Sequence, residues 1–208
     1  MKILLTAFEP YDHWSSNSSW EALTELLRSR GVPNGVVTRR YPVNLDKLSE
    51  RMAKDLEMGF DAVLHMGQAP GSCAIRLETI AINVAGLTHR PGEMFGPIIE
   101  GAPIGYRSQC PYEKMSSELN ASGIPASISY HAGTYLCNAI LYLSHHWHST
   151  RGKSCPIGFA HFPLTLDQIV EAGRDMPGLP KADLARSIEL MLHVLQDATA
   201  SQPRTVLA

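Results

Sequence analysis

The chain has 208 residues, of which 44% are hydrophobic and 18% charged, and its formal net charge is -2. This composition excludes a disordered chain, and we expect one domain over residues 1–208. The charge excludes an electrostatically driven nucleic-acid binder. The opening apolar run is too short for a secretion signal, and no stretch approaches the roughly 20 apolar residues of a membrane span, so we expect a cytoplasmic protein.

The first third of the chain predicts strands and helices in alternation. Apolar runs, helical spacing of leucines and breaks at Gly and Pro separate the segments. In order, we expect a strand at Lys2–Ala7, a loop at Phe8–Asn17, a helix from Asn17 or Ser18 to Arg30, a strand at Val36–Val43, a helix at Asp46–Met58 and a strand at Asp61–Met66.

The remainder continues this pattern after one strand of alternating side chains. We expect that strand at Ala74–Ala85, a long loop at Gly86–Pro111, a helix at Tyr112–Ala121, a strand at Ala126–Tyr130, a helix at Thr134–His148, a strand at Ile157–His161, a helix at Lys181–Ala198 and a loose tail at Ser201–Ala208. This order predicts an α/β fold, a three-layer α/β/α sandwich around a largely parallel, twisted central sheet.

In such sheets ligands collect at the carboxyl ends of the strands. Gln68, Cys137 and His161 each end or follow a predicted strand, so these three residues can share one edge. Cys137 also falls in the first turn of a predicted helix, where the helix dipole favours a thiolate. On this segment alone, a buried structural cysteine is the better interpretation.

A thiol nucleophile needs a base and a group that orients the base. His161 lies between apolar residues and is either a hydrogen-bonded core residue or such a base. Glu78 lies in an apolar strand, where a carboxylate is costly unless paired, although one face of that strand could be solvated. The separations of 59 residues from Glu78 to Cys137 and 24 from Cys137 to His161 do not decide between these interpretations.

Two other patterns in the sequence could indicate binding sites. His145 and His148 are three residues apart on a predicted helix and could face one metal, but no carboxylate or cysteine accompanies them at ligand spacing. Histidines that hydrogen-bond near a helix end explain this cluster better, and we expect no metal and no cofactor. The glycines at Gly67 and Gly71 have no lysine partner, so this loop is not a phosphate-binding loop.

Several segments, in order, resemble the pyroglutamyl-peptidase I family of cysteine peptidases, also called pyrrolidone-carboxylate peptidases. They are MKILLTAFEPYDHWSSN at Met1–Asn17, HMGQA at His65–Ala69, LETIAIN at Leu77–Asn83, Ala102-Pro103, the nucleophile segment with A-G-T-Y-L-C-N within Ile124–Asn138, and GFAHFP at Gly158–Pro163. The resemblance spans most of residues 1–172.

The resemblance implies an exopeptidase that removes N-terminal pyroglutamate through a thioester. By position, Cys137 would be the nucleophile, His161 the general base and acid, and Glu78 the orienting carboxylate. Residues that would bind the substrate are Phe8, Tyr11, Asn17 and Gln68. The implied partner is a peptide with a blocked N-terminus, and family members are often homodimers or homotetramers.

Two segments depart from the family pattern. Tyr11-Asp12-His13 replaces Phe-Gly-Gly, which adds bulk and charge beside the expected pocket. Arg90 matches the family's arginine, an oxyanion candidate, only with a shift. Two alternatives therefore stay open: a thiol hydrolase with altered N-terminal acyl or lactam specificity, and a non-catalytic binding homologue.

Overall fold

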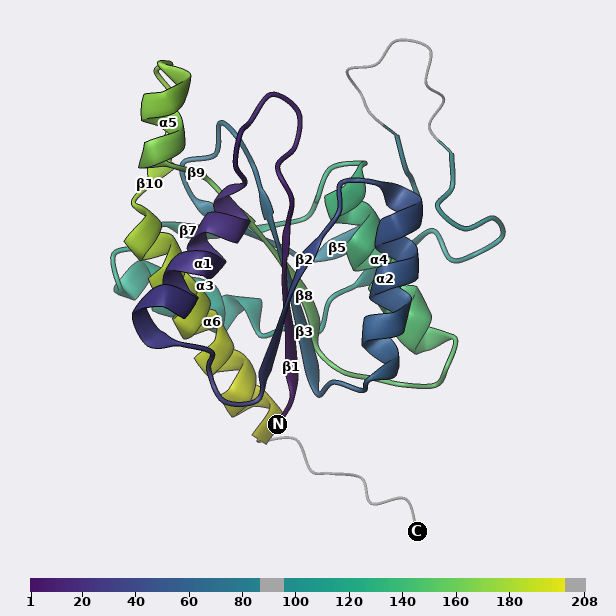
Figure 1. The fold of residues 1–208 in the computed structure, drawn as a ribbon. Coiled ribbons are helices and arrows are strands. Elements are labelled where there is room, and N and C mark those ends of the chain that lie inside the picture. The colour runs from purple at the N-terminus through teal and green to yellow at the C-terminus, as the bar shows by residue number, and fades with distance from the viewer. Residues whose placement is uncertain (87–95, 201–208) are drawn as a thin grey trace.

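The structure is a computed structural model that describes residues 1–86 and 96–200. Its centre is a six-stranded sheet that lies between two groups of helices (Figure 1). The strand order is β2-β1-β3-β8-β4-β7. Parallel pairing joins the first four strands, whereas β4 is antiparallel to β8 and parallel to β7. The strands are β1 (Ile3–Phe8), β2 (Val36–Tyr41), β3 (Ala62–Gln68), β4 (Ile75–Glu78), β7 (Ala126–Ser129) and β8 (Ile157–Phe162). The expected largely parallel sheet is confirmed.

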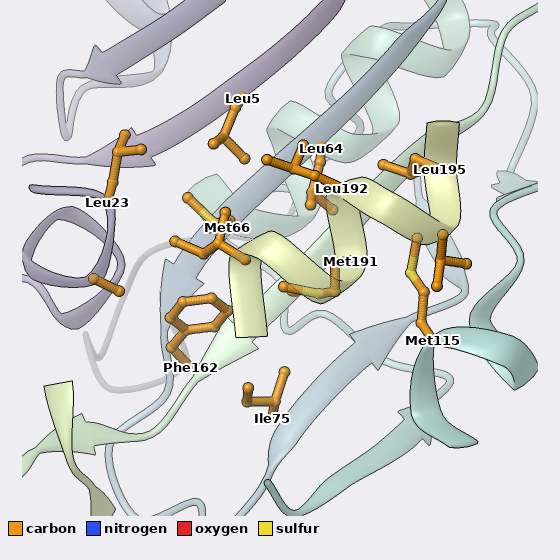
Figure 2. Close-up of a cluster of buried hydrophobic side chains, with 14 of the residues drawn as sticks. Leu5, Leu23, Leu64, Met66, Ile75, Met115, Phe162, Met191, Leu192 and Leu195 are labelled. Atoms are coloured by element: carbon orange, nitrogen blue, oxygen red, sulfur yellow. The ribbon is translucent and has the colours of Figure 1, made fainter. Parts of the chain in front are cut away.

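Helices cover both faces of this sheet, which confirms the three-layer arrangement (Figure 1). One face packs against α1 (Ser18–Arg30), α3 (Tyr112–Ala121) and α6 (Lys181–Ala200), and the other against α2 (Leu45–Glu57) and α4 (Leu136–Ser149). Figure 2 shows the first of these two cores, where Leu5 and Leu64 of the sheet meet Met191, Leu192 and Leu195 of α6.

Local sequence explains where these elements begin. Strands β1 and β3 are almost continuously apolar, as expected for strands that are buried on both faces. The side chain of Asn17 accepts a hydrogen bond from the Ser19 N–H and caps α1, and Asn44 caps α2 in the same way through the Lys47 N–H. Such caps stabilise a helix by about 1 kcal/mol.

The prediction of one strand at Ala74–Ala85 is wrong. The chain leaves the central sheet at Thr79, after β4, and continues as β5 (Ile80–Ile82), which pairs with β6 (Gly105–Arg107) in a separate sheet. Thr79 marks the exchange of partners, because its N–H donates to the Ser129 carbonyl while its own carbonyl accepts from the Ser108 N–H. Strand β6 lies within Gly86–Pro111, where the sequence predicts a loop.

The sequence prediction also missed β9 (Leu164–Thr165), α5 (Leu166–Ala172) and β10 (Gly178–Leu179). The signal for α5 was present, since Thr165 and Gln168 form a capping box. Helix α4 begins at Leu136 rather than Thr134, which still leaves Cys137 in its first turn. The predicted tail at Ser201–Ala208 lies outside the described residues. Among the helices of the described segments, none is both long enough and apolar enough to cross a membrane.

Candidate active site

Glu78 and His161 meet on the α4 side of the sheet. Strands β4 and β8 are antiparallel neighbours, with Arg76 opposite His161, and alternate residues of a strand share one face. The His161 Nδ1–H donates to Glu78 Oε1 at 2.7 Å. Glu78 is 0% exposed and His161 is 5% exposed, so the interpretation of Glu78 as part of a solvated face is wrong. Because Nδ1 carries the proton in this bond, Nε2 of a neutral His161 is free to act as a base.

Tyr112 fixes the backbone beneath this pair. Its hydroxyl donates to the Glu78 carbonyl at 3.0 Å and accepts from the Phe159 N–H at 2.9 Å. A side chain at Gly158 would bring its Cβ to 3.0 Å from this hydroxyl, so glycine leaves the room that Tyr112 needs. One buried phenol from α3 thus ties β4 to β8.

Cys137 lies beside this pair, in the first turn of α4. A Cβ on Gly67 of β3 would lie 3.0 Å from the Cys137 sulfur, and Gly67 is paired with His161 across β3 and β8. Among the described residues, no side-chain hydrogen bond caps α4, and Tyr135, Leu136 and Cys137 at its start line the adjoining cavity. The N-terminal end of a helix stabilises negative charge placed next to it.

Asn138 holds this end of α4 in place. Its Oδ1 accepts from the Ile82 N–H at 2.9 Å, and its Nδ2 donates to the carbonyls of Ile82 and Val84. Because the side chain is fully buried, these three bonds fix the helix start against β5. Sequence reasoning placed Asn138 in a motif but gave it no role.

The electrostatics of the three groups are coupled. Burial lowers the pKa of His161, but the Cys137 sulfur and the Glu78 carboxylate outweigh it and raise this pKa to about 9. His161 therefore favours its imidazolium form at neutral pH, beside the Cys137 sulfur and the Glu78 side chain. This arrangement can activate a thiol and later deliver a proton to a leaving group.

A cavity of about 410 Å³ opens next to Cys137. All four residues expected to bind substrate line it, namely Phe8, Tyr11, Asn17 and Gln68. Tyr135, which sequence reasoning did not single out, also lines it, and its ring centroid lies 5.9 Å from that of Tyr11. The cavity thus combines aromatic walls with a few amide groups.

The two amide side chains are already oriented by the protein. Gln68 Oε1 accepts from the Ser18 N–H and from Gln168 Nε2, each at 2.7 Å. Asn17 Oδ1 accepts from Ser19, and its Nδ2 donates to the Glu9 carbonyl at 3.2 Å. Asn17 therefore shapes the pocket wall mainly as a helix cap, and Gln168 is a support that sequence reasoning missed.

The unusual loop at Tyr11-Asp12-His13 contributes one residue to the cavity. Tyr11 lines it, whereas Asp12 and His13 are not among its lining residues. Asp12 has a φ of 58°, a left-handed conformation that favours glycine, and its Oδ2 lies 2.7 Å from His13 Nδ1. Arg90, the oxyanion candidate, lies outside the described residues.

Two of the histidines of α4, His146 and His148, make hydrogen bonds, whereas His145 Nε2 is buried without a hydrogen-bond partner among the described residues. His148 Nδ1 donates to the Ser144 carbonyl at 2.9 Å, and His146 Nδ1 lies 2.8 Å from the Tyr106 hydroxyl. Within residues 1–86 and 96–200, no group of three or more His, Cys, Asp or Glu side chains could hold a metal ion.

The α/β/α fold and the carboxylate, imidazole and thiol at its sheet edge define a hydrolase of the cysteine-peptidase class. Comparison with known proteins narrows this class. A family model described as pyroglutamyl peptidase matches residues 1–197. Since this match covers most of the chain, the protein belongs to the pyroglutamyl peptidase family.

Individual relatives agree with this assignment. Pyrrolidone-carboxylate peptidase of Pyrococcus furiosus is 38% identical over 176 residues, which cover 82% of this chain and 85% of the relative. The enzyme of that name from Thermococcus litoralis is 31% identical over 206 residues, with 94% and 93% covered. The solved structure of pyrrolidone carboxyl peptidase from Thermococcus litoralis superposes with a TM-score of 0.88 at 29% identity and covers 100% of this chain and 98% of its own.

Proposed function

We propose that this protein removes an N-terminal pyroglutamyl residue from peptides, with Cys137 as nucleophile and His161 as general base and acid. Family membership supports the substrate class, because the relatives are named for the pyrrolidone carboxyl group. The observation that carries the mechanism is the 2.7 Å bond from His161 to the fully buried Glu78, next to a thiol that lines a 410 Å³ cavity.

In this mechanism the Cys137 thiolate attacks the carbonyl carbon that joins the pyrrolidone ring to the next residue. The N–H groups of the first turn of α4 stabilise the oxyanion, and each such donor is worth about 3–4 kcal/mol. The protonated His161 donates its proton to the leaving amine, which leaves a thioester on Cys137. Water, deprotonated by His161, then releases pyroglutamate and restores the thiol.

Recognition of the lactam follows from the cavity lining. A pyrrolidone ring has two apolar faces, one N–H and one C=O, and therefore needs aromatic walls and few polar partners. Phe8 and Tyr11 provide the walls. Both lone-pair directions of Gln68 Oε1 are occupied by Ser18 and Gln168, so Gln68 offers its Nε2–H to the lactam carbonyl.

A chromogenic pyroglutamyl amide tests this function. The wild-type protein should release the chromophore, and Cys137→Ser should lose all but about 0.1% of the rate, as expected when a nucleophile is removed. Cys73→Ser, at an exposed cysteine, is the matched control and should keep the rate. Full activity in Cys137→Ser would refute the mechanism. Turnover of other N-acyl amides in place of the pyroglutamyl amide would refute the substrate assignment.

Three broader expectations remain proposals. The chain would fold as one domain, act in the cytoplasm on peptides with a blocked N-terminus and assemble as a homodimer or homotetramer. Light scattering coupled to size-exclusion chromatography measures the assembly directly, and a mass equal to one 22.8 kDa chain would refute it.

A further inference from the structure

Two buried polar atoms beside the site have no hydrogen-bond partner among the described residues. They are Glu78 Oε2 and Arg76 Nε. Glu78 is 0% exposed, and a carboxylate removed from water is costly unless another charge compensates it. The single bond from His161 leaves half of this carboxylate unsatisfied.

Strand geometry places Arg76 next to that carboxylate. Arg76 precedes Glu78 by two residues, so both side chains leave the same face of β4. It is also the residue directly opposite His161 in the antiparallel pairing of β4 with β8. Arg76 Nε lies 3.5 Å from Glu78 Oε1, the oxygen that accepts from His161, so this oxygen is shared by guanidinium and imidazole.

We propose that Arg76 is a positioning residue of the active site, which compensates the buried charge of Glu78 and holds its carboxylate against His161. The proposal rests on the catalytic roles given above. With Arg76 in place, the carboxylate, imidazolium and thiolate are balanced by a second cation. Without it, the buried site carries one excess negative charge, which disfavours the thiolate.

Few other charged or titratable groups reach this site from the described elements. Besides Arg76, helix α4 contributes Cys137, α3 contributes the Tyr112 hydroxyl, and the segment before α4 brings His131 to the cavity. The residue of β3 opposite His161 is Gly67, which has no side chain and therefore adds no charge. Arg76 is the one arginine or lysine within 4.0 Å of Glu78 in this part of the chain.

The test is the pH dependence of Cys137 alkylation by iodoacetamide, followed by peptide mass mapping. It needs no substrate, so it is independent of whether the pyroglutamyl assignment is correct. In Arg76→Gln the midpoint of the rate profile should move up by about one pH unit, because a cation that favours the thiolate is lost. Arg76→Lys should restore most of the wild-type midpoint.

Arg28→Gln is the matched control, since it removes the same charge from an exposed pair with Glu25 on α1, and its midpoint should not move. Arg76→Met keeps the aliphatic stem and replaces Arg76→Gln if that variant does not fold. A neutral variant that is folded and has the wild-type midpoint overturns the proposal. So does an Arg76→Lys midpoint as displaced as that of the neutral variant.

Discussion

Replacement of Glu78 by Gln removes one buried charge at nearly constant size. The carboxylate is 0% exposed and bonded to His161 at 2.7 Å, so the variant loses a charge-assisted hydrogen bond, worth about 1.5–3 kcal/mol. It also loses the attraction that stabilises the imidazolium when His161 protonates the leaving amine. From the two losses together, we expect transition-state stabilisation to fall by about 2–4 kcal/mol, which lowers kcat/KM about 30- to 1000-fold.

The pH dependence of kcat/KM should also change in a defined direction. Burial lowers the pKa of His161, whereas Cys137 and Glu78 raise it to about 9. Without the carboxylate charge this pKa falls, so the basic limb of kcat/KM should move to lower pH in Glu78→Gln. The assay is hydrolysis of a chromogenic pyroglutamyl amide from about pH 5 to about pH 10.

Glu25→Gln, at a surface carboxylate of α1 paired with Arg28, is the control and should behave as the wild type. The reasoning is refuted if Glu78→Gln stays folded, keeps kcat/KM within about twofold and retains a basic limb near pH 9.

Three further predictions concern the support of the site and the core. Gly67→Ala should lower kcat/KM about 10- to 100-fold, because the new Cβ would lie 2.8 Å from Phe159 Cζ and 3.0 Å from the Cys137 sulfur and would displace the sulfur from His161. Asn138→Ala should lower the free energy of unfolding in urea by about 2–3 kcal/mol, since three buried hydrogen bonds to Ile82 and Val84 are lost. His65→Asn should make stability less dependent on pH: burial first, and then the charges of neighbouring histidines, lower the pKa of His65 to about 3. Between about pH 3 and 6.5 the unfolded state therefore binds one proton more than the folded state. As the pH falls through this range, the wild-type protein loses about 1.4 kcal/mol of stability per pH unit. His65→Asn should not show this loss.

Each of these predictions has a clear counter-result. Wild-type kcat/KM in Gly67→Ala means that the thiol is not confined by β3. An unfolding free energy unchanged by Asn138→Ala means that these bonds are replaced by water at no cost. Identical slopes of stability against pH for His65→Asn and wild type, between about pH 4 and 6, mean that His65 does not stay neutral in the folded state.

Sequence patterns predicted the sheet and its main helices because their signals are local. The apolar run of β1 and the Asn17 cap of α1 are both within a few residues of the elements they define. The break at Thr79 could not be predicted in this way. It depends on partners about 30 and 50 residues away, Ser108 and Ser129, and the alternation of side chains continues across it.

The same distinction applies to the site. Glu78, Cys137 and His161 were found because they lie in motifs that resemble a family, whereas their separations in sequence indicated nothing. Tyr112 and Arg76 were missed as site residues, since their importance comes from the antiparallel contact of β4 with β8. A parallel arrangement, which the alternation of strands and helices favours, would not place Arg76 opposite His161.

The most direct test of the account is to trap the acyl-enzyme. The protein is mixed with an activated pyroglutamyl ester, quenched in acid within the first turnover, digested and mapped by mass spectrometry. The account predicts a mass increase of one pyroglutamyl group on the peptide that carries Cys137, and its absence in Cys137→Ser. An adduct on Cys73, Cys110 or Cys155 instead, or product release with no acyl-enzyme at any time, would contradict it.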